Sequence, residues 1–186
     1  MKLFIPALVI AAISGLAAIA SPPSHLLKRA TVTDAQQSLS LITADLDVLT
    51  SSVNALPTSG ATITDVIPIG LNCLILLGSM AETLADFQSL AGTIPILTAT
   101  NILTTVQSIE GAIVTVVNIL VSKKTAIEGV LPGASVFALK TFRTWTSGIA
   151  SAMAAVAPIT IPASTITTIR NALDTTFATA ITTFGG

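Results

Sequence analysis

Apolar residues recur at alternating steps of three and four along most of the chain, and this spacing constrains the fold more than any other feature of the sequence. Residues three and four apart lie on one face of an α-helix, so the spacing predicts amphipathic helices. The first helix is expected to start at Thr33 and Gln36, which fit a capping box, and to end before Pro57. Its predicted inward residues are Leu39, Ile42, Leu46, Leu49, Val53 and Leu56.

Proline and glycine divide the rest of the sequence into four more segments of this kind, which begin near Pro68, Pro95, Pro132-Gly133 and Pro162. Their predicted inward residues are Gly70, Cys73, Leu77, Met80, Leu84, Phe87 and Ala91; Ile102, Val106, Ile109, Ile113, Val116 and Leu120; Val136, Leu139, Phe142, Ile149, Met153 and Val156; and Ile166, Ile169, Leu173, Phe177, Ile181 and Phe184. Short connections make consecutive helices antiparallel. We therefore expect an all-α fold, an antiparallel bundle of about five amphipathic helices with an apolar interior.

The N-terminal segment is predicted to be removed by two cleavages. Lys2 precedes an uncharged apolar stretch, and Ala18-Ile19-Ala20 has the small-x-small form that signal peptidase accepts, which predicts a signal peptide over 1–20 cut after Ala20. Lys28-Arg29 is a dibasic pair typical of kexin-like processing, so 21–29 is predicted to be a pro-segment cut after Arg29; a solvated linker is the alternative. The remaining helical-bundle domain spans 30–186, and we expect it to be secreted, extracellular or in the cell wall.

Charged residues are scarce, which limits the partners of the chain. Of its residues 52% are hydrophobic and only 9% are charged, against roughly 25% charged in ordinary soluble domains. All nine acids and five of the eight bases remain after the predicted processing, so the mature net charge is 5 − 9 = −4. Without a basic excess, nucleic acid is excluded as a partner. The apolar stretches are interrupted, as by Pro95, so integral membrane insertion is not expected either.

The residue types that perform catalysis or bind metals are almost missing. The only histidine, His25, lies in the predicted pro-segment, so a serine nucleophile has no histidine base. Glu82 and Asp86 share a helix face, which is more typical of a solvated acidic stripe than of a metal site. Cys73 lies in an apolar run and is expected to pack as a small hydrophobe. We therefore expect a binding protein, with neither enzymatic activity nor a cofactor or metal.

Several features also occur together in one known family. They are the signal peptide, the dibasic Lys28-Arg29, the Leu56-Pro57 break, paired lysines at the end of 116–124, and Ala157-Pro158 before an Ala/Thr-rich last helix. In type and spacing, without a signature motif, they resemble the fungal hydrophobic surface-binding protein A (HsbA) family, which includes the cell-wall galactomannoproteins. The resemblance covers nearly all of 30–184. It implies a secreted or wall-associated helical bundle that adsorbs to hydrophobic surfaces and, in some members, encloses a fatty acid.

Two functions remain open at this point, a carrier of a fatty acid or other lipid and a structural or adhesive wall protein that coats a hydrophobic solid surface. Interaction with a protein, either recruitment of a secreted enzyme or contact with a host receptor, is a third, with no signature in the sequence. In a carrier, the acyl chain is expected to contact inward residues that an ordinary core also needs: Leu46, Leu49, Leu77, Met80, Leu84, Phe87, Val106, Ile109, Ile113, Leu139, Phe142, Met153, Leu173 and Phe177.

A carboxylate head group must be either solvated or paired with a base if the acyl chain is buried. The candidates are Arg143 and Lys140, which lie three apart on the fourth predicted helix, next to inward positions. The guanidinium of Arg143 suits a bidentate carboxylate contact. The alternative is that Arg143 is a surface residue near acidic helices.

Overall fold

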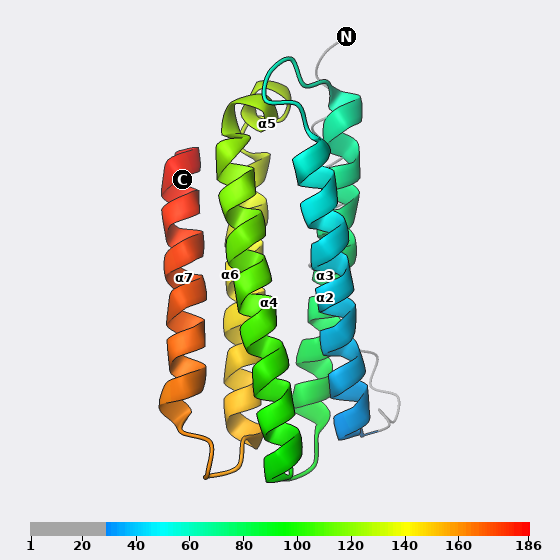
Figure 1. Ribbon diagram of the computed structural model, residues 1–186, viewed down its shortest axis with the longest axis vertical. Helices are drawn as coiled ribbons and strands as arrows, with labels where there is room; N and C mark the ends of the chain where they lie inside the picture. The colour runs from blue at the N-terminus through cyan, green and yellow to red at the C-terminus, as the bar shows by residue number, and fades with distance from the viewer. Residues whose placement is uncertain (1–28) are drawn as a thin grey trace.

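In the computed structural model, residues 29–186 are described, and they form six helices joined by short loops (Figure 1). The helices are α2 (Val32–Ala55), α3 (Ile63–Ser89), α4 (Ile96–Ser122), α5 (Lys124–Val130), α6 (Ala134–Val156) and α7 (Ala163–Phe184). This confirms the all-α class and the five long helices. The short α5 is additional. The predicted signal peptide, its cleavage after Ala20 and the predicted pro-segment up to Lys28 lie outside the described residues.

The five long helices form a closed ring around one interior. α2 packs against α3 and α4, α7 packs against α4 and α6, and α6 closes the ring against α3. In Figure 1, α4 lies in front, between α2 and α7. Consecutive long helices run in opposite directions, as predicted, but the main neighbours of α4 are α2 and α7, whose direction it shares. α5 lies across one end of the ring, in contact with α3, α4 and α6.

A ring of five leaves more room at its centre than a bundle of four. With neighbouring helix axes about 9 Å apart, five axes lie about 8 Å from the centre and four lie about 6 Å from it. Large side chains are therefore needed to fill the space along the bundle axis. Phe87 of α3 and Phe177 of α7 are among the largest fully buried ones, at 1% and 2% exposed. The interior is a single apolar core built from all six helices.

The predicted inward residues follow the observed register closely, with a few exceptions. Most are buried, whereas Cys73, Leu84, Val106, Leu120 and Val136 are half-buried. Gly70 is half-buried too. Ala91 is exposed because α3 ends at Ser89, so its predicted inward position is wrong.

Two helices start earlier than predicted because their caps are different residues. α2 is capped by Thr31, whose backbone N donates to Asp34 Oδ2 at 2.7 Å while its hydroxyl accepts from Asp34 N at 3.2 Å. Thr33 is already helical, so the predicted box of Thr33 and Gln36 is wrong. α3 begins after Thr62, whose backbone N donates to Asp65 at 2.8 Å. Pro68 therefore lies inside α3 rather than in its first turn, where it removes one backbone hydrogen bond.

The paired lysines between α4 and α5 bind the ends of two other helices. Lys123 Nζ donates to the carbonyl of Leu56 at 2.6 Å, just after α2, and Lys124 Nζ donates to the carbonyl of Thr183 at 2.5 Å, in the last turn of α7. Carbonyls at a helix C-terminus lack intrahelical partners and carry partial negative charge. The two lysines thus hold α2 and α7 at the end of the ring that α5 covers.

The outer surface of the helices is rich in threonine, and its hydroxyls bond to the protein itself. Thr100, Thr115 and Thr167 donate to the carbonyls of Ile96, Gly111 and Ala163 at 3.0, 2.8 and 2.9 Å, each four residues earlier. The same pattern recurs on α2, α6 and α7. These bonds satisfy the hydroxyls within the helix without using charged side chains.

A row of small polar side chains, called the polar seam below, joins α2 to α3. It consists of Ser38, Asp45 and Ser52 on α2 and of Asn72, Ser79 and Asp86 on α3, each set spaced by seven residues. Asn72 Nδ2 donates to Ser52 Oγ at 2.6 Å, and Ser79 Oγ donates to Asp45 Oδ2 at 2.5 Å. Asp86 lies beside Ser38 at the third level. The seam therefore extends along most of the contact between these two helices.

Candidate functional site

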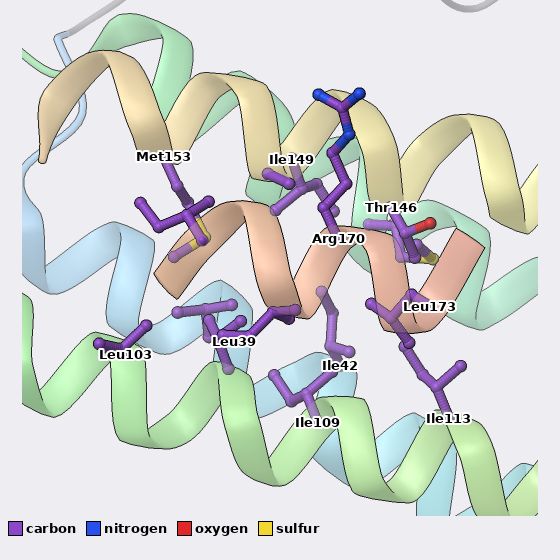
Figure 2. A pocket seen from close by; sticks show the side chains of 15 residues that line it. Leu39, Ile42, Leu103, Ile109, Ile113, Thr146, Ile149, Met153, Arg170 and Leu173 are labelled. Atoms are coloured by element: carbon purple, nitrogen blue, oxygen red, sulfur yellow. The ribbon is translucent and has the colours of Figure 1, made fainter. Parts of the chain in front are cut away.

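The interior of the ring contains an apolar cavity between all five long helices, shown in Figure 2 and called the lower cavity below. Its volume is about 50 Å³, which is space for a few water molecules. It is lined by Leu39, Ile42, Met80, Leu103, Val106, Ile109, Ile113, Thr146, Ile149, Ala150, Met153, Ile166, Ile169, Arg170 and Leu173. Only Thr146 and Arg170 are polar in this set.

A second cavity, the upper cavity, lies toward the end of the ring covered by α5. Its volume is about 90 Å³. Its lining comes mainly from α3 and α6, with contributions from α4, α5 and the end of α7: Val66, Ile69, Gly70, Cys73, Leu74, Leu77, Leu120, Ile127, Leu131, Ala134, Ser135, Ala138, Leu139, Phe142 and Phe184. The only side-chain polar groups here are the Ser135 hydroxyl and the Cys73 thiol.

Two smaller cavities, of about 20 Å³ each, lie along the same bundle axis: one is between the lower and upper cavities, and the other is at the opposite end from α5. The middle cavity shares Ile42, Met80, Ile113 and Thr146 with the lower cavity and shares Leu120, Leu139 and Phe142 with the upper one. The end cavity, near the α3–α4 and α6–α7 loops, shares Leu103, Met153 and Ile166 with the lower cavity. The four cavities thus follow the bundle axis, and single layers of side chains separate them.

The predicted lining residues lie along this series of cavities, with one exception. Val106, Ile109, Ile113, Met153 and Leu173 line the lower cavity, and Leu77 lines the upper one. The other placements are Met80 in the lower and middle cavities, Leu139 and Phe142 in the upper and middle, Leu46, Leu49 and Phe177 in the middle, and Phe87 in the end cavity. Leu84 lines none of them and instead approaches Gly148 of α6. Contact of these residues with a ligand stays a prediction.

The two predicted head-group residues lie away from the four cavities. Arg143 Nε and Nη2 donate to the two carboxylate oxygens of Asp174 at 2.6 and 2.8 Å, which joins α6 to α7 on the outside of the ring. This pair raises the pKa of Arg143 and lowers that of Asp174. Lys140 is exposed. Both bases lie outside the inward face marked by Leu139 and Phe142, and the structure thus favours the surface alternative for Arg143.

Arg170 of α7 is the one charged residue that lines any of the four cavities. It is not among the head-group residues predicted from the sequence, although it directly follows Ile169 and precedes Leu173 by three positions, both of them inward. In the sequence, the feature that indicates Arg170 is its place next to the inward residues of its helix. Its distance from the cavity depends on how α6 packs against α7, which periodicity within one helix does not show.

The thiol and the carboxylates that could take part in a reaction do not come together in one site in the part of the chain that the structure describes. Burial raises the pKa of the Cys73 thiol to about 12, so it stays protonated and a poor nucleophile at neutral pH. Asp34, Glu82 and Asp86 line a surface depression at the start of α2. Among residues 29–186, no group of three or more His, Cys, Asp and Glu side chains is arranged to hold a metal.

Two helices of the described chain, α3 and α4, are long and apolar enough to cross a membrane when judged by length and composition. Helices in the core of an apolar bundle meet the same criterion. The outward face of α3 carries Ile67, Leu71 and Ile75, which are 46%, 55% and 56% exposed. The bundle thus presents apolar side chains to its surroundings as well as to its interior.

Comparison with solved structures shows that this fold occurs in ligand-binding proteins. The structure of AFMP4P in complex with palmitic acid superposes with a TM-score of 0.77 at 18% identity, covering 83% of this chain and 100% of that one. Ligand binding domain 1 of the Penicillium marneffei MP1 protein, complexed with arachidonic acids, gives 0.74 at 12% identity, covering 84% and 100%. Domain 2 of the same protein, complexed with multiple arachidonic acids, gives 0.74 at 13% identity, covering 87% and 99%.

The sequence itself has no match among protein-family models or among curated proteins. At 12–18% identity, the structural similarity establishes a shared fold. It extends over essentially the whole length of each of these all-helical domains, so the ring of helices has the same overall architecture as these domains. Membership of the HsbA family stays a prediction.

Proposed function

We propose that the protein is a secreted binding protein that holds a fatty acid or similar single-chain lipid inside its ring of helices. The observation that carries this proposal is the series of four apolar cavities along the bundle axis. An acyl chain is long, narrow and apolar, and a series of cavities in line provides that shape. The same fold holds palmitic or arachidonic acid in three solved complexes, which supports the choice of ligand class.

Binding requires the interior to widen, because each cavity now has a volume between about 20 and 90 Å³. The layers between the cavities contain side chains that can move. Met80 separates the lower from the middle cavity, and Met153 separates the lower from the end cavity. Methionine is unbranched and adapts its shape readily. We infer that these two side chains move aside when an acyl chain enters.

The energy available is sufficient for a carrier. Each buried methylene contributes about 0.8 kcal/mol, so a chain of about twelve methylenes contributes about 10 kcal/mol before the cost of association. That cost, together with the rearrangement of the interior, brings the expected dissociation constant to the micromolar range.

The test is titration of delipidated protein with palmitate, followed by displacement of a fluorescent fatty-acid analogue. Saturable binding with a stoichiometry of at least one supports the proposal. Mass spectrometry of organic extracts from the purified protein provides an independent measurement, because a carrier is expected to retain lipid. Absence of both co-purified lipid and saturable titration would refute the carrier function.

Adsorption to a hydrophobic solid surface is a second candidate, and the exposed apolar side chains favour it. Besides the α3 face, Leu97 at the start of α4 is 82% exposed, and Ile159 in the α6–α7 loop is 101% exposed. Depletion of the protein from solution by hydrophobic beads tests this function. A closed carrier stays in solution with its lipid, whereas an adsorbing protein is depleted whether or not lipid is present.

Secretion rests on the N-terminal sequence alone. N-terminal sequencing of the protein from culture filtrate is expected to give Ala30 as the first residue, or Ser21 if the site after Arg29 is not used. Protein that is found only inside cells with Met1 intact would contradict the extracellular assignment.

A further inference from the structure

Arg170 occupies the boundary between the lower cavity and solvent. It lies on α7 between the inward Ile169 and Leu173, and its side chain lines the cavity together with Thr146 of α6. The residue as a whole is exposed. Figure 2 shows its guanidinium directed away from the cluster of apolar side chains, with the aliphatic stem beside them. Long basic side chains commonly bury the stem and keep the charge in water in this way.

The nearest acid to Arg170 on the same helix face is already engaged by another base. Asp174 lies one turn further along α7 and accepts from Arg143 through both carboxylate oxygens. Arg143 is the main cause of the lowered pKa of Asp174, to which the charge of Arg170 also contributes. Within the described residues, Arg170 itself donates no hydrogen bond to any side chain or carbonyl. Its five N–H donors are thus available to a ligand at the cavity wall.

We propose that Arg170 binds the carboxylate of a free fatty acid whose chain lies in the lower cavity, and that the protein therefore selects free acids over esters and alcohols. This inference rests on the proposed function. A guanidinium binds a carboxylate through two parallel hydrogen bonds, which neither a methyl ester nor an alcohol reproduces with the same charge. The head group then stays at the boundary with water, where the charge avoids the cost of burial.

The role of the Arg143–Asp174 pair follows from this geometry. Arg170 and Asp174 are four residues apart on α7, a spacing at which opposite charges attract each other. By engaging both oxygens of Asp174, Arg143 leaves the guanidinium of Arg170 for the ligand. Arg143 is thus a positioning residue that acts through Asp174, at the surface of the ring.

The test compares the dissociation constants of palmitate and methyl palmitate, measured by displacement of a fluorescent probe, in wild type and three variants. In Arg170→Gln, palmitate is expected to bind about 5- to 20-fold more weakly, while methyl palmitate is unchanged. Lys140→Gln removes the same charge from an exposed site on α6 and is expected to change neither value. Arg143→Gln releases Asp174 and is expected to weaken palmitate binding by a smaller factor, and adding Asp174→Asn is expected to restore it.

The outcomes separate the inference from the proposed function. If wild-type protein binds palmitate and methyl palmitate equally well, this result supports the carrier function but overturns the proposed role of Arg170. An equal loss for both ligands in Arg170→Gln also overturns it, because the residue then acts through packing of its stem. If wild-type protein binds neither ligand, both the proposed function and this inference fail. Unchanged methyl palmitate binding also demonstrates that each variant is folded.

Discussion

The two helical hairpins of the ring are held together in different ways. α2 and α3 are joined along their length by the polar seam, in which small side chains meet at three levels. Between α6 and α7, beside their apolar packing, the side-chain polar contact is one exposed ion pair, Arg143 with Asp174, whose side chains are 41% and 48% exposed. Directly beside this pair, Thr146 and Arg170 line the lower cavity. The two hairpins thus differ in how far polar side chains join them, at three levels between α2 and α3 and at one level between α6 and α7.

The largest expected effect tests whether the two hairpins share a single core. Phe87 of α3 and Phe177 of α7 are both almost completely buried. Replacing either by alanine is expected to lower the free energy of unfolding by about 3–5 kcal/mol, as measured by urea denaturation. The control is Phe137→Ala, because Phe137 is 45% exposed and its loss is expected to be small. A loss below about 1 kcal/mol for Phe177→Ala would show that the α7 side is loosely packed.

The second prediction concerns the polar seam. Ser79→Ala removes the hydroxyl that donates to Asp45 and leaves the carboxylate without this bond in a partly buried position. We expect a loss of about 1–2 kcal/mol in the free energy of unfolding. Ser40→Ala serves as the control, since the Ser40 hydroxyl is exposed and bonds only to the carbonyl of Gln36. Equal stability of the two variants would mean that the seam contributes nothing beyond its packing.

The third prediction uses pH to distinguish the hairpins. Burial raises the pKa of Asp86 above its usual 3.8, opposed by a hydrogen bond from Ser38 and assisted by the charge of Asp34. The folded state therefore favours protonated Asp86, and this contribution is present below pH 3.8 and is lost as the pH rises through the raised pKa. Asp174 behaves oppositely: its lowered pKa stabilises the fold above pH 3.8, and this is lost as the pH falls through that lowered value.

Thermal melts of two variants measure the opposite contributions of Asp86 and Asp174 to stability. At pH 7, Asp86→Asn is expected to raise the Tm and Asp174→Asn to lower it. As the pH is lowered, the difference for Asp86→Asn is expected to shrink as the pH falls through the raised pKa of Asp86, and that for Asp174→Asn only as it falls through the lowered pKa of Asp174. A change of the same sign in both variants at pH 7 would contradict the contrast between the hairpins.

The smallest expected effect is that of breaking the pair between α6 and α7. Arg143→Gln is expected to change the Tm less than Ser79→Ala does, because both partners are exposed and exposed ion pairs contribute little. Repeating the melts in 1 M NaCl, where charges are screened, should remove the remaining difference. A loss as large as that of Ser79→Ala would show that this pair holds the hairpin together.

The sequence was sufficient to predict the five long helices and most of their inward residues, because each depends on local periodicity. It was less informative at the helix starts, where several Thr and Asp residues fit a cap equally well. Thr31 and Thr62 act as caps because the chain is extended there, which the pattern does not show. The seven-residue helix α5 is too short to display a repeat.

The sequence predicts the apolar lining of the cavities, but it does not predict which base lies beside them. An apolar lining follows from the inward stripes, whereas the position of a base relative to a cavity depends on packing between helices. Arg143 and Arg170 both adjoin inward residues in the sequence. The structure pairs Arg143 with Asp174 and places Arg170 at the lower cavity. The charged neighbour across the α6–α7 contact thus determines that Arg143 is held in a two-bond ion pair.

The threonine hydroxyls on the outer helix faces affect how the protein is wetted. Each hydroxyl that donates to a carbonyl one turn earlier uses its only proton within the helix, as at Thr100, Thr115 and Thr167, so toward water it can only accept hydrogen bonds. With 9% charged residues, the exterior holds few ions to organise a hydration layer. Such an exterior is polar by composition but offers water few charges and few hydrogen-bond donors. Contact with wax, oil or air therefore displaces little tightly held water, even while the bundle stays closed.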